Sequence, residues 1–298
     1  MHIPVLLDEI LKFLADKKFS TFFDGTVGMG GHAEAILKGH PEIKKYLACD
    51  QDKDALRQAE KRLSPWKDKV EFIHGNFSHI QDYLKEKKIP CVDGVLFDVG
   101  VSSYQLDTET RGFSFMKKGP LDMRMDQSLP LTAETVVNEF PEKKLGELFR
   151  DLGEERRWRL AAKAIAEARA KKRIETTWDL VEVLQRVLKR TRHLHPATLV
   201  FQALRIYVND EIHALEKGLK SAIEKLCPEG MIGVISFHSM EDRIVKNQFR
   251  DLKARKKKAG ELTLLTKKPV VPTMKEMRAN PRSRSAKLRF AQKRGMDE

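Results

Sequence analysis

Short apolar runs alternate with amphipathic segments over the first third of this 298-residue chain. The runs have the length of buried strands, whereas the segments between them repeat their apolar residues at helical spacing. The expected strands are residues 19–23, 46–49, 70–74 and 92–97, and a fifth covers 230–236. Strands that alternate with helices in this way predict an α/β fold with a mostly parallel sheet.

A long helical stretch interrupts this alternation. Residues 131 to about 200 have a period close to 3.6 and contain no strand pattern. Helices between the fourth and fifth strands predict an inserted domain. We therefore expect a discontinuous domain of residues 1–106 and 207–298, interrupted by a helical substrate-recognition domain of residues 107–206. The elements expected after the fifth strand are a helix capped by Ser239 and Asp242 and an antiparallel hairpin of residues 262–265 and 286–290.

The C-terminal fifth differs from the rest of the chain in charge. Residues 243–298, which include the run Arg255–Lys258, hold 18 Lys and Arg against 5 Asp and Glu. Residues 1–242 hold 38 of each, so the whole net charge of +13 lies at one end. A basic end on a neutral body favours contact with a polyanion at one place, with a solvated tail as the alternative.

Composition disfavours two classes of protein. No apolar run approaches the roughly 20 residues of a membrane span, and the N-terminal residues lack the order of a signal peptide. Cys49, Cys91 and Cys227 lie far apart and have no metal-ligand spacing. We therefore expect reduced thiols in a cytoplasmic protein, and no metal site.

Polar or aromatic side chains follow four of the expected strands. Asp24, Asp50 and Asp98 end strands one, two and four, and Phe77 comes shortly after strand three. Because ligands of open α/β sheets bind at the carboxyl ends of the strands, these four side chains predict one ligand site. The ring of Phe77 is expected beside an adenine, with core packing as the alternative.

A glycine-rich turn follows the first strand and opens the next helix. Gly28, Gly30 and Gly31 allow a ligand to approach backbone N–H groups and the helix N-terminus closely. Asp24 beside this turn disfavours a dinucleotide pyrophosphate. It favours a cofactor with a cationic amino-acid end, namely S-adenosylmethionine. Asp50 follows Gly28 by 22 positions, which suits an acid that binds ribose hydroxyls.

Several strings of the chain together resemble the bacterial 16S rRNA (cytosine-N4) methyltransferase family, which belongs to the class I S-adenosylmethionine-dependent methyltransferases. They are His2–Leu6, Asp24–His32, Gly119–Met125, Pro196–Ile206, Ser236–Arg243 and Asn280–Arg289. The resemblance covers nearly the whole chain. It implies a Rossmann-like fold, methylation of a decoding-centre cytidine, and 16S rRNA or the 30S ribosomal subunit as partner. A homodimer is compatible with it, and a membrane is not involved.

The resemblance also implies site residues, position by position. The residues that fall at the family's cofactor contacts are Gly30, Gly31 and His32 for the amino-acid end, Asp50 for the ribose, Phe77 for the adenine, and Asp98 and Gln105 for the remainder. Neither His32 nor Gln105 stands out from the residue pattern alone.

Asp98 is also the candidate catalytic residue. The amino lone pair of cytosine is delocalised into the ring, so an acceptor for its N–H bonds would favour attack on the methyl group. Many amino-group methyltransferases have Asp/Asn-Pro-Pro-aromatic after the fourth strand, whereas Val99-Gly100-Val101 follows Asp98. The N4 target atom therefore depends on the resemblance.

Two other functions remain as alternatives. One is a non-catalytic RNA-binding protein that has kept a degenerate cofactor fold, which the full set of strand-end residues disfavours. The other is a nicotinamide dehydrogenase, which Asp24 and the spacing of the glycines disfavour.

Overall fold

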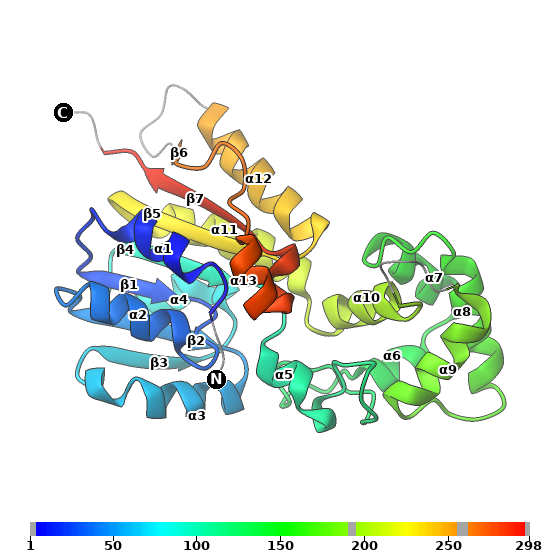
Figure 1. The fold of residues 1–298 in the computed structure, drawn as a ribbon. Helices are drawn as coiled ribbons and strands as arrows, with labels where there is room; N and C mark the ends of the chain where they lie inside the picture. The colour runs from blue at the N-terminus through cyan, green and yellow to red at the C-terminus, as the bar shows by residue number, and fades with distance from the viewer. Residues whose placement is uncertain (1–3, 190–194, 255–261, 296–298) are drawn as a thin grey trace. The chain divides into compact units, whose positions relative to one another are not determined.

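The computed structural model describes residues 4–189, 195–254 and 262–295, which form two compact units (Figure 1). The first unit contains Met1–Gly100 and Ile212–Glu298, and the second contains Val101–Glu211. These boundaries lie within a few residues of the expected ones, and the role of the inserted part in substrate recognition stays a prediction. The basic run Arg255–Lys258 lies outside the described ranges.

A seven-stranded sheet forms the centre of the first unit in the described part of the chain, in the order β3-β2-β1-β4-β5-β7-β6. Neighbours among β1 to β5 are parallel, and β7 is antiparallel to both β5 and β6. The strands are β1 Thr21–Asp24, β2 Lys45–Asp50, β3 Val70–His74, β4 Val92–Asp98, β5 Leu226–Ser236, β6 Leu262–Leu264 and β7 Lys287–Lys293. This confirms the predicted α/β fold with its antiparallel last hairpin.

Helices cover both faces of this sheet, which explains why its central strands β1 and β4 are mostly buried. Phe22 packs in a cluster with residues of α1, α2 and α3, whereas its neighbour Phe23 packs in a cluster with residues of α4, α11 and α12. Successive strand side chains point to opposite faces, so adjacent phenylalanines serve two cores. The helices are α1 Leu7–Leu14, α2 Gly31–Gly39, α3 Lys53–Arg62, α4 Ile80–Glu86, α11 Glu211–Lys225, α12 Ser239–Ala254 and α13 Met274–Ala279, with 3₁₀ turns at Ser64–Trp66, Phe77–His79 and Pro281–Ser285.

The second unit is helical and has a core of its own. Its helices are α5 Ser103–Asp107, α6 Ala133–Glu139, α7 Glu142–Asp151, α8 Trp158–Arg169, α9 Thr177–Val187 and α10 Thr198–Val208, with a 3₁₀ turn at Glu109–Arg111. Leu145, Phe149, Ile165, Leu184 and Leu204 are buried together there. None of the helices within the described ranges is long and apolar enough to cross a membrane.

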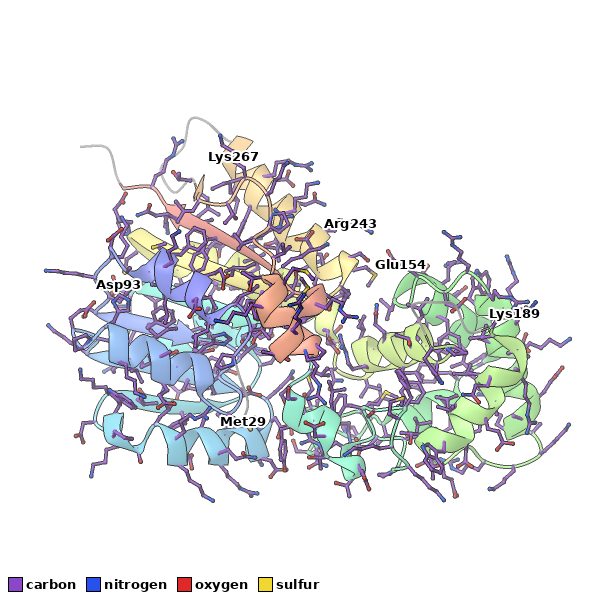
Figure 2. All side chains as sticks on the ribbon, viewed as in Figure 1. Met29, Asp93, Glu154, Lys189, Arg243 and Lys267 are labelled. Carbon is purple, nitrogen blue, oxygen red and sulfur yellow. A yellow bond between two sulfur atoms is a disulfide. The ribbon has the colours of Figure 1, made fainter. Side chains whose placement is uncertain are left out.

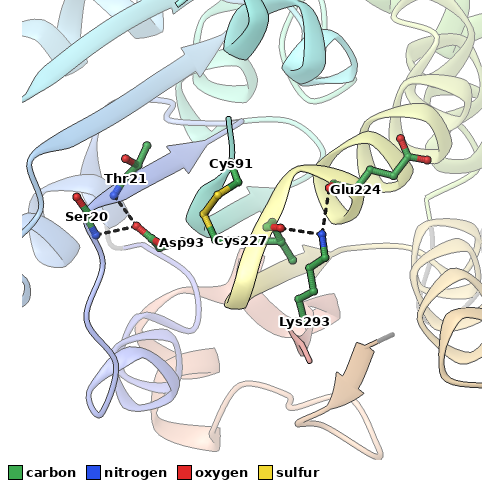
Figure 3. Close-up of a disulfide and its surroundings, with 8 residues drawn as sticks. Ser20, Thr21, Cys91, Asp93, Glu224, Cys227 and Lys293 are labelled. Atoms are coloured by element: carbon green, nitrogen blue, oxygen red, sulfur yellow. Dashed lines mark hydrogen bonds between the residues drawn. A yellow bond between two sulfur atoms is a disulfide. The ribbon is translucent and has the colours of Figure 1, made fainter. Parts of the chain in front are cut away.

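Cys91 and Cys227 form a disulfide, which corrects the expectation of three separate thiols (Figure 3). Cys91 directly precedes β4, Cys227 lies near the start of β5, and their neighbours Val92 and Leu226 are paired in the sheet. The two Cα atoms are 5.0 Å apart although 136 positions separate the residues. Spacing along the chain does not reveal that the two strands begin side by side. Cys49 is a buried free thiol.

We expect replacement of both bridged cysteines by serine to lower the melting temperature. The bridge closes a loop that contains the entire second unit, and loop-closure entropy gives it a stabilisation of about 5 kcal/mol at most. Differential scanning calorimetry with and without reductant measures the effect. Thiol titration in denaturant should find one thiol without reductant and three with it. In a Cys49→Ala control, titration without reductant should find no thiol, and reductant should still lower the melting temperature. Three thiols without reductant would contradict the bridge.

Candidate functional site

The glycine-rich turn lies between β1 and α2, where the sequence predicts it, and Figure 2 labels its Met29. Gly28 and Gly30 have φ angles of +53° and +78°, which side chains with a Cβ rarely adopt. Gly30 is the N-cap of α2, and no side chain caps the helix at this residue. A Cβ at Gly31 would lie 2.7 Å from a carbon of Pro4. The turn therefore needs its glycines and presents backbone at a helix N-terminus, where an anionic group such as a carboxylate binds favourably.

Asp50 ends β2 and is held by backbone N–H groups on both of its oxygens. Oδ2 accepts a hydrogen bond from the N–H of Gly28 at 2.8 Å, and Oδ1 accepts one from the N–H of Asp52 at 2.9 Å. Burial raises the pKa of Asp50 to about 6, although these hydrogen bonds oppose the rise. The strand-end acid and the glycine turn are thus joined by a hydrogen bond, and contact of Asp50 with ribose hydroxyls stays a prediction.

Asp24 ends β1 and is almost completely buried. Its Oδ1 accepts a hydrogen bond from the N–H of Thr26 at 3.1 Å, and its Oδ2 accepts one from the hydroxyl of Tyr46 at 3.0 Å. The pKa of Asp24 is raised to about 7, mainly by burial. Because both oxygens have partners inside the protein, Asp24 shapes the turn and adds charge to the site. Direct contact of Asp24 with a cofactor stays a prediction.

Asp98 ends β4 and has a different environment. Its Oδ1 is buried and has no hydrogen-bond partner among the described residues. Its backbone N–H donates to Oγ1 of Thr26 at 2.6 Å, which ties the end of β4 to the glycine turn. Burial, with the nearby charges of Asp24 and Glu241, raises the pKa of Asp98 to about 8. A buried carboxyl oxygen without a partner suits a ligand that brings a positive charge or an N–H donor.

His32 lies in the first turn of α2 and faces Asp98. Its Nδ1 is 3.7 Å from Oδ2 of Asp98, and its Nε2 is 2.9 Å from the carbonyl oxygen of Val5. Since a carbonyl can only accept, Nε2 carries the hydrogen and Nδ1 is the atom directed at the carboxyl group. The segment before α1 thereby fixes the ring. A sequence pattern gives no signal for this contact, which joins residues 27 positions apart.

The remaining predicted residues lie in different surroundings. The ring of Phe77 is buried against that of Phe97, with centroids 4.6 Å apart, which is the core-packing alternative. Gln105 belongs to the second unit, where its Oε1 accepts a hydrogen bond from the N–H of Ser102 in a capping box at α5. Contacts of Phe77 and Gln105 with a cofactor stay predictions.

The arrangement of the first unit suits a cationic cofactor. Three carboxyl groups end neighbouring strands, and Asp98 keeps an oxygen without a partner in the described structure. The glycine turn offers a helix N-terminus for a carboxylate. S-adenosylmethionine carries a sulfonium, an ammonium and a carboxylate, so these groups match its charges.

A family profile and two relatives match nearly the whole chain. The profile of the MraW methylase family matches residues 1–294. A ribosomal RNA small subunit methyltransferase H of Persephonella marina is 47% identical over 296 residues, which cover 98% of this chain and 99% of that protein. The protein of the same name from Protochlamydia amoebophila is 48% identical over 98% of this chain and 97% of its own length. An rRNA methylase structure from Streptococcus thermophilus aligns with 99% of both chains, at 11% identity and a TM-score of 0.46.

We expect the affinity for S-adenosylmethionine to rise between about pH 6 and pH 8. A cationic ligand favours ionised carboxyl groups, so binding releases the protons that Asp50 and Asp98 hold, with pKa values of about 6 and about 8. One released proton changes the affinity by at most about tenfold per pH unit. Isothermal titration calorimetry over this range measures the effect.

S-adenosylhomocysteine is the matched control for this experiment. It has the same amino-acid end but no sulfonium charge, so its affinity should depend less on pH. Asp98→Asn should reduce the difference in affinity between S-adenosylmethionine and S-adenosylhomocysteine above pH 7. Equal pH profiles for both ligands in the unmodified protein would show that the carboxyl groups do not respond to the sulfonium.

Proposed function

The chain belongs to the MraW methylase family, and from this premise we propose that it methylates the exocyclic N4 amine of a decoding-centre cytidine in 16S rRNA. The methyl donor is S-adenosylmethionine. The observation that carries the proposed chemistry is the buried Oδ1 of Asp98, which has no partner in the described structure and lies at the end of β4. The names of relatives 47% and 48% identical to this chain support small-subunit rRNA as the substrate class.

The cofactor supplies a methyl group that its sulfonium already makes electrophilic. The protein must orient the amine toward this methyl group and accept the proton that the amine loses. In our proposal Oδ1 of Asp98 accepts a hydrogen bond from the amine N–H. As the N–C bond forms and the C–S bond breaks, the N–H proton passes to this carboxylate. Asp98 must therefore be ionised when the substrate arrives, which the positive charge of the bound cofactor favours.

His32 supports this step through its position. Its Nδ1 faces Oδ2 of Asp98 at 3.7 Å, while Oδ1 has no partner in the described structure. The imidazole thus lies beside one oxygen of the carboxyl group and leaves the other for the substrate. The contact of Nε2 with Val5 fixes the ring, so its Nδ1 stays beside the carboxyl group.

The proposal extends to the surroundings of the reaction. A base that is methylated at an exocyclic amine must leave its stack, so the substrate is a single-stranded or splayed region of the rRNA. The partner is then 16S rRNA or the 30S subunit, and the location is the cytoplasm. A homodimer stays an untested expectation from the sequence.

The first test is transfer of a tritiated methyl group from S-adenosylmethionine to under-methylated small subunits and to naked 16S rRNA. Nucleoside analysis of the labelled RNA should find N4-methylcytidine at a single position. Label on another atom would retain the methyltransferase activity and refute the N4 assignment. Absence of label on both RNAs, with the cofactor bound, would refute 16S rRNA as the acceptor under these conditions.

Asp98→Asn tests the role of the carboxylate. The amide keeps the shape but cannot take up a proton, so we expect turnover to fall by roughly a hundredfold, a common effect of removing a general base. The dissociation constant of the cofactor should change less than tenfold. Stopped assays under single-turnover conditions separate the chemical step from binding.

Asp93→Asn is the matched control for Asp98→Asn. Asp93 lies near the opposite end of β4, where its Oδ2 accepts hydrogen bonds from the N–H groups of Ser20 and Thr21, both at 2.8 Å (Figure 3). Its amide variant should keep wild-type turnover. Equal loss of turnover and cofactor binding in Asp98→Asn would reduce Asp98 to a cofactor ligand.

A further inference from the structure

We propose that a basic cleft within the helical unit binds phosphate groups of the RNA substrate. This inference rests on the proposed function, in which the substrate is rRNA. The cleft has a volume of about 510 Å³. Its lining residues are Arg157, Gln185, Arg186, Val187, Leu188, Lys189, His195 and Pro196. Every ionisable side chain in this lining is basic.

Three segments of the second unit bring these residues together. Arg157 is the N-cap of α8, the run from Gln185 to Lys189 closes α9, and His195 and Pro196 precede α10. Figure 2 labels Lys189, which lies two residues after the end of α9. The carboxylate of Glu155 accepts the N–H of the α8 N-cap at 2.8 Å, so the positive charge of this wall comes from its side chains. An anion is therefore the ligand that the wall favours.

Two of the cations have no counter-charge within the described part of the chain. The guanidinium of Arg157 and the ammonium of Lys189 make no hydrogen bond or ion pair there, and the carboxylate nearest along the chain, that of Glu155, accepts the backbone N–H of Arg157 at 2.8 Å instead. Arg186 contacts Glu182, 2.5 Å away on the same helix, and both side chains are exposed. An exposed pair of this kind is weak and readily exchanged for a phosphate contact.

Several other arginines nearby are used by the fold itself. Arg159 stacks on the ring of Trp158 at 4.0 Å, and Arg169 donates a hydrogen bond to the carbonyl of Val137 at 2.7 Å. Arg124 makes two hydrogen bonds to the carboxylate of Asp122. Arg156 is exposed but does not line the cleft, so Arg157 is the arginine at the start of α8 that a ligand in the cleft would contact.

His195 gives the cleft a fixed ring. The imidazole stacks on Phe115 with centroids 4.7 Å apart and an angle of 9° between the planes. Its Nδ1 accepts a hydrogen bond from the N–H of Ala197 at 3.2 Å, so Nε2 carries the hydrogen and donates to the amide of Gln185, 3.1 Å away, through the amide oxygen. A ring held in this way loses little freedom when a ligand binds. Phosphate groups contacted by such a cleft position an RNA without reading its sequence.

The test is an Arg157→Ala/Lys189→Ala double variant. RNA affinity, measured by fluorescence anisotropy with an rRNA fragment that contains the target, should fall roughly tenfold at low salt. The slope of log affinity against log salt should decrease by about 1.4, because each lost phosphate contact of single-stranded RNA removes about 0.7. Cofactor affinity should not change, since both residues lie in the helical unit and outside the cofactor-binding candidates.

Lys143→Ala/Lys171→Ala is the matched control. These lysines are exposed in the same unit, lie outside the cleft, and their removal changes the net charge equally. The control should bind RNA as the unmodified protein does. If the two double variants lose affinity equally, the effect is one of overall charge and the cleft assignment is wrong.

Inorganic phosphate distinguishes a small-anion site from an RNA site. If phosphate shifts the NMR signal of His195 while the Arg157/Lys189 variant keeps full RNA affinity, the cleft binds small anions and the proposal is overturned. A wild-type RNA affinity with no N4-methylcytidine in the transfer assay would refute the proposed reaction and leave the cleft intact. The two proposals therefore fail by different measurements.

Discussion

Three carboxyl groups converge at one edge of the sheet because β2, β1 and β4 run parallel and adjacent. Burial raises the pKa values of Asp24, Asp50 and Asp98 to about 7, about 6 and about 8. The groups also act on one another, since the charge of Asp50 opposes ionisation of Asp24 and that of Asp24 opposes ionisation of Asp98. The folded chain thus holds more protons than the unfolded chain between about pH 4 and pH 8, and these groups destabilise it as they ionise. A cationic ligand relieves this repulsion.

Two segments far apart in the sequence, the start of α1 and α13, meet beside this edge of the sheet. Leu6, at a φ of 55°, donates its N–H to Oε1 of Glu276 at 2.8 Å, although 270 positions separate the two residues. The preceding carbonyl, that of Val5, contacts His32, and His32 faces Asp98. A contact between α13 and the start of α1 therefore reaches the candidate site through one histidine ring. Removal of the Glu276 carboxylate would act on the site without touching a ligand.

The fold was predictable because its signals are local. Apolar runs gave the strands, and the polar residue after each run gave the edge where Asp24, Asp50 and Asp98 meet. Contacts between distant segments left no such signal. The bridge of Cys91 with Cys227 depends on strands that begin side by side. The helix after β5 was expected to use Asp242 in a capping box, but Glu241 accepts the N–H groups of Phe237 and His238, and Asp242 binds Arg289 of β7. Glu241 and Asp242 are both acids near the start of the helix, so the sequence does not show which of them caps it. The position of Arg289 in β7 decides, because it binds Asp242.

The three carboxyl groups all lie at strand ends, but they differ in how many of their oxygens have hydrogen-bond partners. Both oxygens of Asp24 are used by Thr26 and Tyr46, and both oxygens of Asp50 accept backbone N–H groups. A carboxylate whose lone pairs are directed at fixed donors can hold a turn in shape and contribute charge, but it is poorly placed to accept a proton from a substrate. Asp98 alone among the three has a buried oxygen without a partner in the described structure. The division supports Asp98 as the reacting group, with the other two as the frame that fixes the glycine turn and sets the local charge.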